Sequence, residues 1–90
     1  MINYQLTVGG LVQGVGFRWS CLRLAQQLGV VGLVKNLSTG QVYIEVQGNP
    51  NAVTKFINQV AKGPTPYAQV CDIQQEEAPL KDYRSFTIRR

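Results

Sequence analysis

The sequence G-L-V-Q-G-V-G-F-R, from Gly10 to Arg18, joins a segment typical of a β-strand to one typical of a helix. Before it, apolar and polar residues alternate over residues 2–9, which is the period of a strand with one buried face. After it, apolar residues recur at the spacing of one helix face. The stretch is therefore a strand-to-helix turn, and it decides how the first two elements are connected.

Two glycines of this turn, Gly14 and Gly16, favour an anion-binding site. Glycine adopts positive φ angles and leaves room for a ligand against the main chain. Such a turn can point several N–H groups at one spot, and the helix that follows adds free N–H groups and the positive end of its dipole. The guanidinium of Arg18 matches phosphate or carboxylate oxygens. The residues favour a cradle for a compact anion, with a purely geometric role of the glycines as the alternative.

Missing motif residues, the lack of histidine and the cysteine spacing exclude several other kinds of functional site. The turn lacks the third glycine of the dinucleotide fingerprint and the Gly-Lys-Ser/Thr ending of a P-loop. The chain has no histidine, and Cys21 and Cys71 lack C-x-x-C spacing, so the usual zinc sites and histidine-activated nucleophiles are excluded. We expect two buried free thiols, as in a reducing cytosol, with a bridge between them as the alternative.

The 90 residues are expected to form a single domain, residues 1–90, because this length buries one core without staples. The net charge of +4 favours anionic ligands, but the basic residues are dispersed and form no nucleic-acid stripe. No apolar run approaches the roughly 20 residues that span a bilayer, and no secretory leader is apparent. We therefore expect a cytoplasmic monomer without membrane or nucleic-acid partners.

The hydrophobic pattern predicts the order β-α-β-β-α-β. The six elements of this order are strand 2–9, helix 17–28, strands 30–36 and 42–47, a helix from Pro50 to Gly63 and strand 68–76, and residues 85–89 are expected to add a short final strand. This order is typical of the ferredoxin-like split βαβ arrangement, which is an α+β fold. We expect two amphipathic helices on one face of an antiparallel sheet of four to five strands.

The other face of that sheet is expected to be exposed. Its predicted side chains are Asn3, Gln5, Thr7, Tyr43, Glu45 and Gln47. One tyrosine among polar residues is a poor platform for stacking RNA bases, which argues against an RNA-binding sheet. Trp19 projects onto the polar side of the first helix near the cradle, where it either lines a substrate mouth or packs on the surface.

Along almost its whole length the chain resembles the acylphosphatase family. The similarity rests on the Gly10–Arg18 turn, Leu28-Gly29, G-L-V-K-N at residues 32–36, Gly63-Pro64 and the closing Phe86-Thr87-Ile88. One departure is Leu33, which stands where the family often has tryptophan. We expect this difference to change packing near the strand and to leave the candidate site side chains untouched.

The resemblance implies hydrolysis of the carboxyl–phosphate bond of acyl phosphates to carboxylate and phosphate, without metal or organic cofactor. The phosphoryl group would be bound by residues Gln13, Gly14, Val15, Gly16, Phe17 and Arg18. The guanidinium of Arg18 would hold the same group, and the carboxamide of Asn36 would orient the attacking water. Taken alone, Asn36 is also typical of a turn-forming residue. The alternative function is a non-catalytic binding module for phosphate or carbamoyl phosphate.

Overall fold

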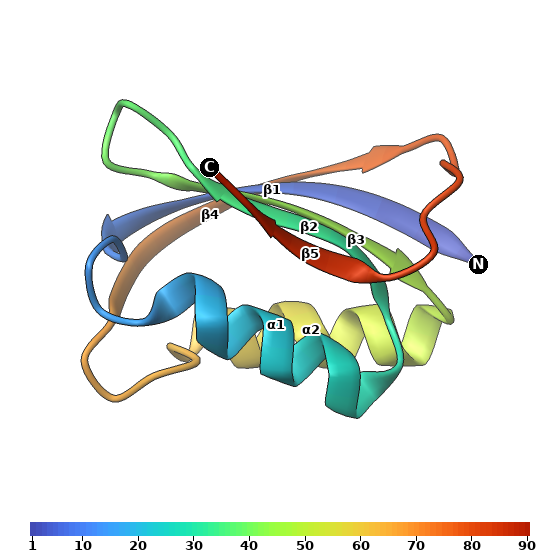
Figure 1. Cartoon of the computed structure of the whole chain (residues 1–90), viewed down its shortest axis with the longest axis horizontal. Helices are drawn as coiled ribbons and strands as arrows, with labels where there is room; N and C mark the ends of the chain where they lie inside the picture. Colours follow the sequence, from blue (N-terminus) through green and yellow to red (C-terminus); the bar gives the residue numbers. More distant parts are fainter.

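The computed structural model describes all 90 residues as two helices packed on one face of a five-stranded sheet (Figure 1). In chain order the elements are β1 (Ile2–Leu11), α1 (Phe17–Leu28), β2 (Val31–Asn36), β3 (Val42–Gly48), α2 (Pro50–Ala61), β4 (Gln69–Ala78) and β5 (Phe86–Arg89). This arrangement confirms the predicted α+β, ferredoxin-like class.

The sheet differs from the prediction in the direction of its last strand. The strand order is β4-β1-β3-β2-β5, and the first four of these strands pair antiparallel with their neighbours. β5 pairs parallel with β2, at the edge opposite β4. The segment after β4 therefore crosses the whole sheet to its opposite edge, where β5 runs in the same direction as β2. The sheet is mixed rather than wholly antiparallel.

Local sequence accounts for the ends of both helices. α1 begins after Gly16 and ends before Gly29, and both glycines are left-handed, at φ 76° and 72°. α2 begins after Asn49, whose Oδ1 accepts a hydrogen bond from the backbone N–H of Asn51, with Pro50 at its first position. Neither helix is long and apolar enough to cross a membrane.

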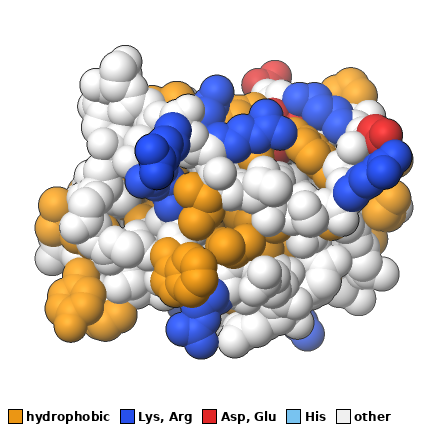
Figure 2. Space-filling view, in the orientation of Figure 1, with side chains coloured by type: hydrophobic (Ala, Val, Ile, Leu, Met, Phe, Trp, Pro, Cys, Tyr) orange, Lys and Arg blue, Asp and Glu red, His pale blue; other side chains and the backbone are white.

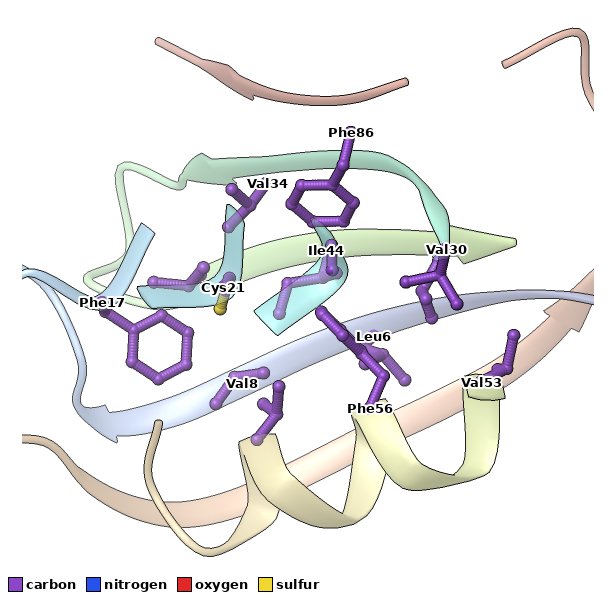
Figure 3. Close-up of a cluster of buried hydrophobic side chains, with 14 of the residues drawn as sticks. Leu6, Val8, Phe17, Cys21, Val30, Val34, Ile44, Val53, Phe56 and Phe86 are labelled. Carbon is purple, nitrogen blue, oxygen red and sulfur yellow. The ribbon is translucent and has the colours of Figure 1, made fainter. Parts of the chain in front are cut away.

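The hydrophobic core lies between the helices and the sheet (Figure 3). Its buried side chains include Leu6, Val8, Phe17, Cys21, Val34, Ile44, Val53, Phe56 and Phe86. The rings of Phe56 and Phe86 join α2 to β5, with centroids 5.7 Å apart. Burying each large apolar side chain stabilises the fold by about 1.5–3 kcal/mol. Because Phe17 is the first residue of α1, the core also anchors the turn that precedes the helix.

Polar residues on the other face of the sheet are more buried than predicted. Asn3, Glu45 and Gln47 were expected to be exposed, but all three are buried. The connection from β4 to β5 covers them: Asn3 Nδ2 donates to the carbonyl of Pro79 at 3.0 Å. The amide of Gln47 pairs with the backbone of Lys81 through two hydrogen bonds of 2.8 Å. The predicted exposure was wrong because the alternation of apolar and polar residues along a strand identifies its polar face but does not show which segment of the chain covers that face.

Glu45 is the centre of a polar cluster beneath this connection. Its carboxylate accepts hydrogen bonds from Tyr43 at 2.8 Å and Tyr83 at 2.7 Å, and Lys81 Nζ lies 2.8 Å from Oε1. Burial alone would raise the pKa of Glu45, but these hydrogen bonds and the charge of Lys81 lower it. Burial and the hydrogen bond to Glu45 raise the pKa of Tyr83 to about 12. The cluster fastens the crossing segment to β3.

The two cysteines occupy different environments. Cys21 is buried in the core and Cys71 is exposed on β4, and both are free. Free thiols were expected, but the expected burial of Cys71 is wrong, because β4 is an edge strand whose residues face mostly solvent. Burial raises the pKa of Cys21 to about 12, so its thiol is inert.

Candidate active site

Two connecting turns and one strand end lie at the same end of the molecule: the β1–α1 turn, the β2–β3 hairpin turn and the C-terminal end of β5 (Figure 1). A cavity of about 200 Å³ opens there. Its lining residues are Val12, Gly14, Gly16, Phe17, Arg18, Trp19, Asn36 and Ile88. The structure thus brings five predicted site residues to one cavity: Gly14, Gly16, Phe17, Arg18 and Asn36.

The two glycines of the turn have the backbone that the sequence predicted. Gly14 and Gly16 have φ angles of 74° and 76°, and no atom lies within 4 Å of the position of an added Cβ. Backbone conformation, rather than crowding, therefore requires glycine there. The carbonyl of Gly16 accepts from the N–H of Ser20 at 3.0 Å, which starts α1 directly beside the cavity. The first N–H groups of a helix lack partners within it, so they are free to bind an anion.

Gln13 and Val15 belong to the predicted site but do not line the cavity. The main-chain contacts predicted for them remain predictions. The side chain of Gln13 has another contact: its Nε2 donates to the carbonyls of Leu37 and Gln41, each at 2.8 Å. These partners lie 24 and 28 residues away, so no local sequence pattern indicates them.

Arg18 and Asn36 line this cavity from two different elements, α1 and β2. Arg18, in the first turn of α1, donates from Nη1 to the carbonyl of Arg89 at 3.2 Å, which ties α1 to the end of β5. Asn36 is the last residue of β2, and its Oδ1 is buried without a hydrogen-bond partner in the chain. An unpaired buried acceptor is costly, and this one belongs to a carboxamide that lines the cavity. The site thus pairs a guanidinium with a carboxamide.

Three apolar lining residues were not assigned to the site from the sequence. Val12 and Ile88 were missed, and Trp19 was left between two alternatives. Trp19 lines the cavity mouth, and its exposed position near the turn was the available signal. Ile88 reaches the cavity through the pairing of β5 with β2, which the sequence did not indicate. Leu33 is buried beside Glu45 in the β2–β3 register and does not line the cavity.

The fold places the chain among ferredoxin-like α+β proteins, and comparison with known proteins gives the family. The model of the acylphosphatase family matches residues 4–88. The chain therefore belongs to the acylphosphatase family, as the sequence indicated.

Individual relatives match this chain over nearly their whole length. An acylphosphatase of Ligilactobacillus salivarius is 42% identical over 88 residues, covering 98% of each chain. One of Thermotoga petrophila is 46% identical over 85 residues, covering 94% of this chain and 93% of the relative. The crystal structure of acylphosphatase from Bacillus subtilis superposes with a TM-score of 0.96 at 36% identity, covering 100% of both chains. These matches support acylphosphatase activity and do not favour the binding-module alternative.

Proposed function

We propose that the cavity between the β1–α1 turn and the end of β2 is the active site for acyl-phosphate hydrolysis. The phosphoryl group is bound by the main chain of residues 13–18 and the guanidinium of Arg18, and Asn36 orients the attacking water. One observation carries this proposal: Arg18 and Asn36 line the same cavity of about 200 Å³ as the glycines of the turn.

Arg18 and the turn supply the charge that the phosphoryl group needs. Phosphoryl transfer is catalysed largely by positioning and by donors placed where negative charge develops. A fork of guanidinium donors suits oxygens of a phosphoryl group, and the N-terminus of α1 adds N–H groups. Removing one such donor typically lowers the rate by about 10²–10³-fold. With these donors in place, we propose that the reaction uses no metal or organic cofactor.

Asn36 has a different role because a carboxamide is not a strong base. Asn36 lines the cavity, and its carboxamide hydrogen-bonds water and holds the water oxygen toward phosphorus. The water oxygen then bonds to phosphorus as the bond from phosphorus to the acyl oxygen breaks. The carboxylate leaves with that electron pair. One water proton stays on the oxygen now bonded to phosphorus, and the other goes to a second phosphate oxygen. A carboxylate is a good leaving group, so no acid is required to protonate it.

We also propose that residues 1–90 act as a monomeric single domain in the cytoplasm, with acyl phosphate and inorganic phosphate as ligands. The exposed free thiol of Cys71 suits a reducing compartment. Residues 4–88 correspond to one family unit, which supports a single domain. The buried polar cluster around Glu45 leaves little open sheet for bases to stack on, which supports the absence of a nucleic-acid partner.

The test compares alanine variants of the two proposed catalytic residues. Arg18→Ala is expected to lose phosphate binding and turnover. Asn36→Ala is expected to lose about 10²-fold in kcat, a cost typical of one misplaced group, while phosphate affinity stays close to wild type. Activity is measured as phosphate release from benzoyl phosphate, with and without chelator, and affinity by phosphate inhibition.

Two exposed residues provide matched controls. Arg23→Ala on α1 and Asn58→Ala on α2 remove the same side-chain types outside the cavity, and both are expected to keep full activity. Near-normal turnover in Asn36→Ala would refute the water-orienting role. Near-normal phosphate affinity in Arg18→Ala would refute the proposed phosphate site. Loss of activity with chelator would refute the metal-free mechanism.

A further inference from the structure

The proposed active site has a polar part and an apolar part. Four of its eight lining residues are apolar: Val12, Phe17, Trp19 and Ile88. The side chains of Val12 and Phe17 are buried in the core, but Trp19 and Ile88 are 59% and 37% exposed. On the face that carries α1 and β5, hydrophobic side chains lie directly beside Lys and Arg side chains (Figure 2). Apolar surface at the mouth of this cavity therefore remains available to a ligand.

A hydrogen bond of Arg18 joins the two elements that carry the exposed apolar residues. Trp19 follows Arg18 in α1, and Ile88 precedes Arg89 in β5. Because Nη1 of Arg18 donates to the carbonyl of Arg89, the first turn of α1 is held against the end of β5. The indole and the isoleucine side chain are thus brought to the mouth of one cavity, next to the guanidinium.

The size of the cavity limits what fits inside it. About 200 Å³ is below the roughly 300–1,000 Å³ typical of pockets that enclose a drug-sized ligand. A phosphoryl group held by the turn and Arg18 occupies the polar part, so the acyl group extends toward the mouth. The exposed apolar side chains that line the cavity are those of Trp19 and Ile88. A flat apolar group can stack on an indole, whereas an acetyl group is too short to cover it.

We propose that Trp19 and Ile88 form an acyl-group subsite that makes this chain selective for acyl phosphates with a large apolar, above all aromatic, acyl group. The inference rests on the proposed function, because it requires the phosphoryl group to lie beside Arg18. Trp19 acts through contact with the acyl group, and its contribution therefore depends on the size of that group.

The first experiment measures kcat/KM for benzoyl phosphate and acetyl phosphate. In Trp19→Ala the benzoyl-to-acetyl ratio is expected to fall about tenfold, the size of a good aromatic contact together with its buried area. Ile88→Ala is expected to lower the ratio less, and Trp19→Phe to retain most of it. Tyr67→Ala is the control: Tyr67 is 73% exposed and does not line the cavity, so the ratio stays unchanged.

A second measurement uses fluorescence, since Trp19 is the chain's single tryptophan. Benzylphosphonate is expected to change the emission of Trp19, methylphosphonate to change it much less, and inorganic phosphate to reverse the effect of benzylphosphonate. An unchanged ratio in Trp19→Ala, or equal losses on both substrates, overturns the subsite. The Arg18→Ala variant distinguishes failure of the subsite from failure of the proposed function. If Arg18→Ala still hydrolyses both substrates, the cavity is not the active site.

Discussion

The side-chain Nε2 of Gln13 lies 2.8 Å from the carbonyl oxygen of Leu37, the residue that follows Asn36. A second hydrogen bond of 2.8 Å reaches the carbonyl of Gln41. One amide group therefore joins the β1–α1 turn to both sides of the β2–β3 hairpin turn. This contact sets the distance between the turn that is proposed to bind phosphate and the carboxamide that is proposed to orient water.

Gln13→Glu should misplace the turn relative to Asn36, because the variant sets a carboxylate against two carbonyl oxygens. We expect kcat/KM for benzoyl phosphate to fall about 10²-fold, the usual cost of a misplacement of about 1 Å. Gln26→Glu, an exposed substitution on α1 with the same charge change, should retain activity. Full activity in Gln13→Glu would mean that the turn holds its position without this contact.

Gly16→Ala and Gly29→Ala should separate backbone strain from damage to the site. Both glycines are left-handed and have no atom within 4 Å of an added Cβ, so each substitution should cost about 1–2 kcal/mol of unfolding free energy. Gly16→Ala should also lose activity, because a relaxed φ turns N–H groups away from the cavity. Urea unfolding and turnover measured on both variants check this. Equal activity in the two variants would contradict an anion-binding role of the turn.

Glu45 should make the stability of the fold sensitive to acid. Its folded pKa is below the ordinary value, so the carboxylate contributes stability above the unfolded pKa of about 4.3. That contribution is lost as the pH falls through the lower, folded value. Unfolding free energies measured between about pH 6 and pH 2.5 should therefore decrease toward acid, and less steeply in Glu45→Gln. Glu76→Gln, an exposed residue of β4, should follow the wild-type slope; an unchanged slope in Glu45→Gln would argue against the cluster.

Cys71 should be the one thiol that reacts in the native protein. It is exposed, whereas Cys21 is buried with a pKa raised to about 12, so little thiolate forms there. We expect a maleimide to label one site per chain under native conditions and two in guanidinium, as counted by mass spectrometry. Native labelling of Cys21, or an absence of reactive thiol, would contradict the placement of these residues.

Much of this protein follows from local sequence. The end of α1 at Gly29, the cap at Asn49 and the left-handed turn at Gly14 and Gly16 each depend on a few neighbouring residues. Alternation along β1 correctly identified the face that packs on the helices. Such features are decided by backbone preferences and by which side chains avoid water, so a short stretch of sequence contains them.

Only the tertiary structure decided the parallel pairing of β5 and the burial of Glu45 beneath the connection that precedes it. The same holds for the partners of Gln13 and for the arrival of Ile88 at the cavity mouth. These contacts join residues far apart in the chain, and periodicity carries no information about which segment covers a given face. Five residues that line the cavity were therefore predicted from the sequence, while their relative positions depend on how the sheet is assembled.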